Sequence, residues 1–162
     1  MKYRLTNETI KVGVVILHRI ECVEAFANVK AGDKGGWIEK ESNLSQTDNA
    51  WVCGDAEVWG KARVWCKAWV YGSAHVYGNA VVYGNAQVYG GAWVCGDAEV
   101  WGKARVSDNA QVSGDAWVCD NAEVWGNAQV WGNAQVYGNA VVSGNAWVRD
   151  NAEVWQRKPT EK

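Results

Sequence analysis

The chain is poor in the residues from which most globular cores are built. Its 162 residues include one proline, one phenylalanine and one methionine. Most cores depend on Leu, Ile, Phe and Met, whereas here valine, alanine and tryptophan take their place. This composition indicates a core made by repetition.

Further absences disfavour several functional classes. No apolar run is long enough to span a bilayer, and the first ten residues lack an apolar stretch of signal-peptide type, so we expect a cytoplasmic protein. The five cysteines form no Cys-x-x-Cys pair, which argues against a disulfide framework or a zinc site and predicts free thiols. The net charge of −2 argues against nucleic acid or an anionic membrane as the partner.

A six-residue repeat fills the chain from 49 to 156. Alanine occurs every six residues from Ala50 to Ala152, eighteen times, and valine follows two places later each time, from Val52 to Val154. The unit is corner-corner-Ala-x-Val-x, and its alternation with period two is typical of a strand. Ala and Val therefore share an inward face, and the two variable positions face outward.

The two corner residues supply the bends between four-residue strands. The first is glycine in thirteen of the eighteen units, and the second is most often asparagine. Both residue types tolerate positive φ. A two-sided coil has no interior, and small side chains such as Ala and Val cannot fill a four-sided one. The repeat therefore predicts an all-β chain, wound as a three-sided parallel β-helix of about six coils with about eighteen residues each.

This pattern resembles the hexapeptide-repeat superfamily, in which an aliphatic residue precedes a small residue by four places. Val58 precedes Ala62 in this way, and Val82 precedes Ala86. The resemblance covers residues 49–156 and implies a single-stranded left-handed parallel β-helix. The sequence departs from the family in one respect. Glycine stands two places after the valine, whereas the family has it directly after the aliphatic residue.

Residues 1–48 lack the repeat and are predicted to form a small β-rich cap on the first coil. A cap protects the open strand edges and core at the end of a solenoid. Residues 2–5 (Lys-Tyr-Arg-Leu), 29–32 (Val-Lys-Ala-Gly), 35–37 (Gly-Gly-Trp) and 43–46 (Asn-Leu-Ser-Gln) resemble the YdcK-like bacterial proteins. That resemblance implies relatives that are often phage- or prophage-borne, labelled transferases because of their fold.

A charged tail, residues 157–162, follows the last repeat. Its proline and charges can protect the edge of the last coil. Alternatively, the open coil docks on another copy of the chain. The sequence supports both readings, because edge protection and edge pairing use the same surface.

Candidate catalytic residues are few. Hexapeptide acyltransferases need a histidine base beside a loop, but His75 occupies an outward position on a flat face and His18 lies in the cap. The γ-carbonic anhydrases of this fold need three histidine zinc ligands, and the chain has two histidines. We therefore expect no catalytic residue, no metal site and no cofactor. Four cysteines are read as repeat variants: Cys53, Cys95 and Cys119 at outward positions and Cys66 at a corner.

Aromatic side chains crowd the outward positions. With eighteen residues per coil, one face carries five aromatics in a column of six places, and Trp117 lies beside the column. This face is the candidate binding surface: Trp65, Tyr83, Trp101, Trp117, Tyr137 and Trp155. The other two faces carry Trp59, Tyr77, Trp93, Trp131 and Trp147, and Trp51, Trp69, Tyr71, Tyr89 and Trp125. So much exposed aromatic surface indicates an interface or a ligand platform. The alternative, favoured by the even division among faces, is that aromatic ladders stabilise the stacked strands.

The sequence therefore predicts a non-catalytic scaffold. It would use an aromatic face or its open C-terminal coil to form a homo-oligomer or to bind a protein partner. Two alternatives come from other classes. One is a phage counter-defence protein that holds a host protein or a nucleotide signal on its aromatics, since bases stack on tryptophan. The other is an acyltransferase of the hexapeptide type.

Overall fold

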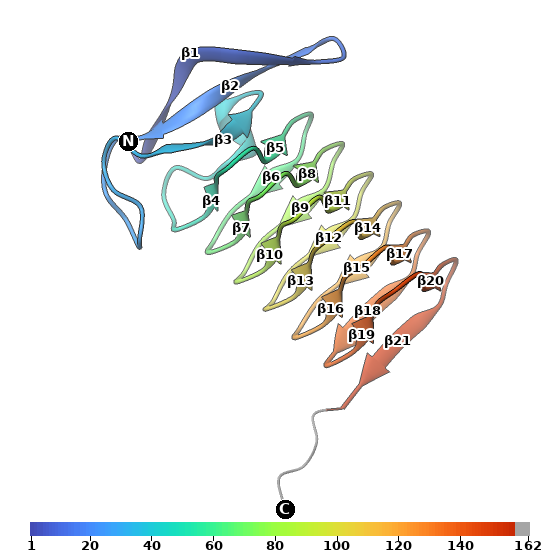
Figure 1. Ribbon diagram of the computed structural model, residues 1–162. Helices are drawn as coiled ribbons and strands as arrows, with labels where there is room; N and C mark the ends of the chain where they lie inside the picture. The colour runs from blue at the N-terminus through green and yellow to red at the C-terminus, as the bar shows by residue number, and fades with distance from the viewer. Residues whose placement is uncertain (158–162) are drawn as a thin grey trace, which may run out of the picture.

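A computed structural model describes residues 1–157 as a rod of three parallel sheets, preceded by a β-hairpin (Figure 1). Strand partners lie eighteen residues apart, as Val58 and Val76 do and as Val100 and Val118 do. Three hexapeptides therefore complete one coil. The predicted all-β parallel β-solenoid of eighteen-residue coils is confirmed, and its left hand stays a prediction from the resemblance.

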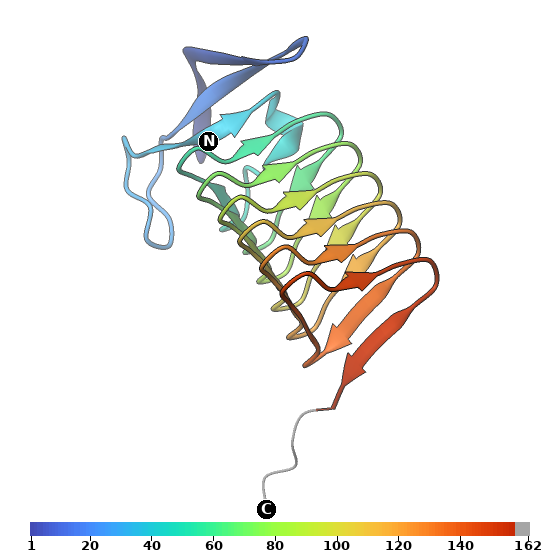
Figure 2. The same cartoon turned by 45° about the vertical axis from the view of Figure 1, so that its right-hand side comes forward.

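Sheet 1 combines the cap strands with one side of the solenoid. Its strands in spatial order are β1 (Tyr3–Val12), β2 (Val15–Cys22), β3 (Lys34–Ile38), β5 (Glu57–Val58), β8 (His75–Val76), β11 (Trp93–Val94), β14 (Gln111–Val112), β17 (Gln129–Val130) and β20 (Trp147–Val148). Pairing is antiparallel among the first three strands and parallel from β3 onward. The hairpin β1–β2 thus extends one wall of the rod beyond its first coil (Figure 2).

Sheets 2 and 3 form the other two sides of the rod. Sheet 2 contains β4 (Trp51–Val52), β7 (Trp69–Val70), β10 (Gln87–Val88), β13 (Arg105–Val106), β16 (Glu123–Val124) and β19 (Val141–Val142). Sheet 3 contains β6 (Arg63–Val64), β9 (Val81–Val82), β12 (Glu99–Val100), β15 (Trp117–Val118), β18 (Gln135–Gly138) and β21 (Glu153–Gln156). A short 3₁₀ helix, η1 (Glu41–Asn43), precedes the first repeat.

Most repeat strands are two residues long, the first variable residue and its valine, instead of the four predicted. The chain turns immediately afterwards. For example, the Ala104 N–H donates to the Trp101 carbonyl across the corner (3.3 Å). Only the first corner residue has positive φ, as Gly102 does at 72°. The asparagines at the second corner position form side-chain ladders between coils instead, such as Asn109 Nδ2 to Asn127 Oδ1 (3.3 Å).

The repeat alanines and valines fill the interior, as the period-two pattern predicted. From Ala56 to Val136 every one of them is at most 1 % exposed. Neighbouring coils bury these small side chains against each other, and no hexapeptide could do so alone. The core is therefore one continuous column along the rod.

Residues 34–48 add a turn of the solenoid that lacks the repeat. Trp37 and Ile38 of β3 pair in parallel with β5, and Leu44 forms a parallel bridge with Val64. The solenoid therefore has about seven turns, although the hexapeptides account for six. Within residues 1–157, no helix is long and apolar enough to cross a membrane. The part of the predicted charged tail from 158 to 162 lies outside the described residues.

Candidate functional site

In the aromatic column of the candidate face on sheet 3, the rings form one stack of three and a separate tilted pair. Trp65 stacks on Tyr83 with ring centres 5.1 Å apart, and Tyr83 stacks on Trp101 at 6.0 Å. Tyr137 and Trp155 form a second pair at 6.4 Å with a tilt of 43°. The stacks are separated because the intervening place in the column holds Cys119, which is buried.

The side chains of this face are unevenly exposed. Trp65 is 42 % exposed, Trp117 43 % and Trp155 53 %, whereas Trp101, at the inner end of its stack next to the Cys119 position, is less accessible. Tyr83 and Tyr137 are also partly covered. Stacked rings cover each other's faces and present mainly their edges to solvent. The most accessible rings of this face are therefore Trp65 at the cap end, Trp155 at the opposite end, and Trp117 beside the column.

Comparable stacks occur on the other faces. The rings of Trp59 and Tyr77 are 4.5 Å apart and nearly parallel on sheet 1, and those of Tyr71 and Tyr89 are 4.8 Å apart on sheet 2. Since all three faces carry them, these ladders support the stacking of coils whatever else they do. Trp51, which the repeat assigns to an outward position, is not exposed to solvent. It is 2 % exposed, because Phe26 packs edge-on against its ring at 5.4 Å and the cap chain covers it.

Cap residues supply hydrogen-bond donors to the first coil. In this solenoid the N–H groups of one coil donate to carbonyls of the next, so the first coil has carbonyls with no repeat before them. Trp37 N–H donates to the Ala56 carbonyl (2.9 Å) and Ser45 N–H to the Val64 carbonyl (3.0 Å). These bonds satisfy groups that would otherwise be costly to bury.

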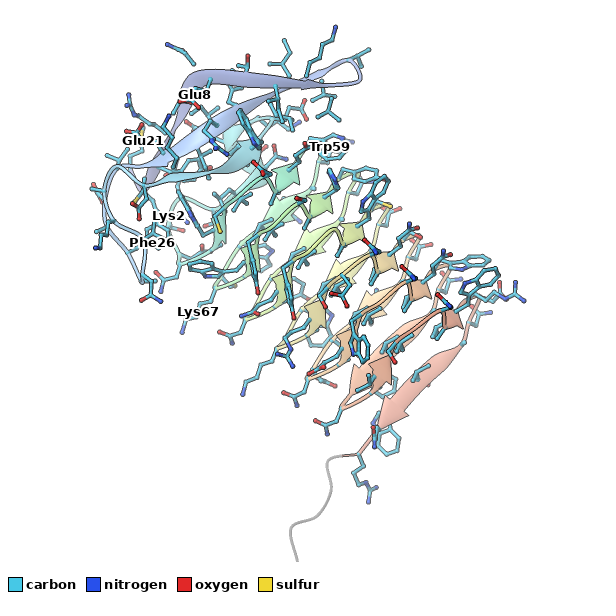
Figure 3. The ribbon with its side chains drawn as sticks, in the orientation of Figure 1. Lys2, Glu8, Glu21, Phe26, Trp59 and Lys67 are labelled. Atoms are coloured by element: carbon cyan, nitrogen blue, oxygen red, sulfur yellow. The ribbon has the colours of Figure 1, made fainter. Side chains whose placement is uncertain are left out.

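Two buried side chains complete this role. The Asn43 amide donates to the Ala62 carbonyl at 2.8 Å. Lys2 Nζ donates to the carbonyls of Ala50 (2.7 Å) and Asp48 (3.0 Å) and lies 4.9 Å from the centre of the Phe26 ring (Figure 3). Burial lowers the pKa of Lys2 to about 8, although Asp48 opposes the shift. Sequence reasoning assigned no role to Lys2 or Asn43, because neither lies in the periodic region.

The opposite end of the rod is open within the described residues. The inward residues Ala146 and Ala152 of the last coil are exposed, and Val154 is half-buried. The rim carries two large exposed aromatics, Trp147 at 63 % and Trp155 at 53 %. This end thus presents both apolar core and strand edge to solvent.

A cleft of about 500 Å³ lies at the junction of the cap and the first coil. Its walls come from η1, the segment after it and β6. The lining residues are Glu41, Ser42, Leu44, Ser45, Gln46, Arg63, Val64 and Trp65. Of the predicted surface, the cleft includes only Trp65, at the cap end of its stack.

The candidate reactive groups lie apart from this cleft. His75 on sheet 1 is half-buried between the edges of Trp59 and Trp93, and its Nδ1 lies 3.2 Å from Glu57. His18 Nδ1 lies 3.2 Å from the Thr6 carbonyl in the cap. Burial raises the pKa of Cys119 to about 11, which opposes thiolate formation. Within residues 1–157 no three His, Cys, Asp or Glu side chains gather as metal ligands would.

The sequence matches a model of the YdcK β-solenoid repeat at residues 74–90, 82–96, 104–120 and 134–150. A search of curated proteins found no match. The family match lies wholly within the hexapeptide region, and all of its segments have the geometry described above.

Proposed function

We propose that this chain, a YdcK-like β-solenoid repeat protein, is a non-catalytic scaffold that associates with a second copy of itself through its open C-terminal coil. The observation that carries the proposal is the contrast between the two ends of the rod. The chain's own cap pairs the strand edges at one end. At the other end, Ala146, Ala152 and Val154 are accessible and edge groups have no partner within residues 1–157.

Strand β21 is the best edge for this contact. It is longer than most repeat strands, and the N–H groups of Glu153 and Trp155 have no acceptor among the described residues. A two-fold axis near Val154 would pair β21 antiparallel with its copy. Sheet 3 would then continue from one chain into the other, and the two Val154 side chains would cover each other.

The charge of this end favours a second copy over an ionic partner. The last coil and the residue after it carry two positive side chains, Arg149 and Arg157, and two negative ones, Asp150 and Glu153. Two copies can therefore approach without net like-charge repulsion. Because the cap blocks the far end, the contact closes as a dimer instead of growing into a filament.

Light scattering behind a sizing column tests the proposal. The wild-type protein is expected at twice the 17.8 kDa chain mass. Trp155→Pro removes an edge donor that no bond within the described chain uses, so this variant should be monomeric with an unchanged circular dichroism spectrum. Trp125→Ser is the matched control, because Trp125 is 41 % exposed on an inner coil. A monomeric wild type, or a polymer that grows with concentration, would overturn the closed dimer.

The aromatic face on sheet 3 is the second candidate for the contact, because Trp65, Trp117 and Trp155 are among the most exposed large side chains. Replacing both Trp101 and Tyr137 with serine should abolish association if this face is used and leave it intact if β21 is used. The non-catalytic part of the proposal has its own test. Acyl transfer from acetyl-CoA that depends on His75 would contradict it.

A further inference from the structure

The stack of Trp65, Tyr83 and Trp101 on sheet 3 ends, on its cap side, at an open space that we call the slot. The slot is part of the cleft that Trp65 lines. Leu44 bridges Val64 in parallel register, so the residue that precedes Trp65 in the outward column is Ser45. The Ser45 side chain is too small to cover an indole. One face of the Trp65 ring is covered by Tyr83 at 5.1 Å, and Trp65 also lines the cleft at the cap end.

The heads of the other two ladders are bounded by different side chains. On sheet 2 the residue before Tyr71 in the Tyr71–Tyr89 ladder is Cys53, which packs against the hydrophobic core, and Trp51 in the neighbouring column is covered by Phe26 and Tyr3. On sheet 1 the residue before Trp59 in the ladder is Glu39, whose carboxylate accepts a hydrogen bond from Gly60 N–H at 2.7 Å. The Trp65 stack thus differs in ending at a cleft that Trp65 itself lines.

We infer that this slot binds a mononucleotide, whose base continues the Trp65–Tyr83–Trp101 stack and whose phosphate pairs with Arg63. A planar heteroaromatic ring matches an uncovered indole face and gains stacking energy whatever its base identity. The cleft volume of about 500 Å³ lies within the range of small-molecule sites. This inference does not depend on the proposed dimer, which uses the other end of the rod (Figure 1).

Arg63 is the group that suits a phosphate. It lines the cleft and is exposed, and it has no ion-pair partner within residues 1–157. Arg105 on the neighbouring sheet, by contrast, is paired with Glu123. A free guanidinium offers a fork of donors that matches phosphate oxygens. A single such group fits one phosphate, whereas a polyanion would meet the acidic solenoid.

A second charged residue of the cleft favours a base with donor groups. Glu41 is exposed there, and its carboxylate can accept hydrogen bonds from amino or imino groups of a base. The same negative charge would repel a phosphate, which directs the phosphate toward Arg63. Gln46 has its amide committed to the backbone of Lys2 and Tyr3, so it forms a fixed wall.

Titration of ¹⁵N-labelled protein with AMP, GMP, CMP and UMP tests the inference by the indole N–H signals. We expect one indole signal, that of Trp65, to shift most, and the purine nucleotides to bind more tightly than CMP and UMP. Adenosine, which lacks the phosphate, and inorganic phosphate, which lacks the base, test the two contacts separately. Each should bind at least about ten-fold more weakly than AMP, because each makes only one of the two contacts. Equal binding of phosphate alone would identify an anion site and overturn the proposal.

Variants assign the contacts. Trp65→Ser and Arg63→Gln should each weaken AMP binding about ten-fold or more, while Trp125→Ser and Arg105→Gln should leave it unchanged. Ser45→Trp should block the slot by adding a ring to the ladder, and it does so without removing any stabilising contact of Trp65. No shift up to 10 mM nucleotide (roughly the weakest affinity worth assigning), or equal loss in the control variants, would refute the site.

Discussion

Replacing Gly84 with alanine should destabilise the solenoid far more than replacing it with aspartate. Gly84 is a first corner residue with φ of 71°. An added Cβ would lie 3.0 Å from both the backbone N and the carbonyl O of Gly102 in the next coil. Alanine therefore meets two costs, the left-handed conformation and the contact with a backbone that cannot rotate away.

The magnitudes follow from these two costs. The left-handed conformation costs a residue with a Cβ about 1–2 kcal/mol, and overpacking against the next coil adds about 1–3 kcal/mol. We expect Gly84→Ala to lower the free energy of unfolding by ~2–4 kcal/mol.

Aspartate recovers part of this loss. Natural aspartates at corners have the same backbone conformation, as Asp108 does at 58° and Asp120 at 60°. Their carboxylates accept hydrogen bonds from N–H groups one coil onward, Asp108 from Gly126 at 3.1 Å and Asp120 from Gly138 at 3.0 Å. In Gly84→Asp the acceptor would meet the N–H of the glycine in the next coil. This bond and the tolerance of Asp for positive φ should make the variant at least about 1 kcal/mol more stable than Gly84→Ala.

Guanidinium chloride unfolding, followed by tryptophan fluorescence, measures both variants against the wild type. The midpoints should shift while the slopes stay constant. Gly84→Asn is the uncharged control, since its amide oxygen can accept the same bond without adding charge. Equal losses for alanine and aspartate would refute the role of the corner N–H, and a loss below about 0.5 kcal/mol for alanine would refute the tight contact between coils.

Two further predictions concern buried titratable groups. Because burial lowers the pKa of Lys2 to about 8 from its ordinary 10.5, the unfolded chain holds more protons on this group between these values, and Lys2 makes the free energy of unfolding rise with pH there. In Lys2→Met this contribution should vanish. Urea unfolding across pH 7–11, about the span of the Lys2 titration, would measure the difference. An unchanged pH dependence would contradict the lowered pKa of Lys2. Cys119 is buried, and its pKa is raised to about 11. It should therefore react with iodoacetamide at pH 8 at least about ten-fold more slowly than Cys66 at its corner. Peptide mass mapping would measure both rates, and equal rates would contradict the burial of Cys119.

The repeat alone determines most of the solenoid. An uninterrupted period of six assigns every alanine and valine to the interior, because each coil meets an equivalent coil and the side of each residue follows from its place in the unit. The same regularity correctly placed Trp65, Tyr83 and Trp101 in one column. The strand length was less predictable, since it depends on where the backbone begins to turn around the first corner residue.

Only the tertiary structure decided what happens at the ends of the rod. Lys2 and Asn43 contact carbonyls eighteen or more residues away, and no period in the sequence relates them. Trp51 has the same repeat environment as exposed tryptophans and is buried because Phe26 folds over it. The slot above Trp65 exists because Ser45, outside the repeat, takes the next place in the ladder. A periodic pattern specifies the contacts of a coil that has like neighbours on both sides. At a terminus one neighbour is missing, and non-periodic residues determine what replaces it.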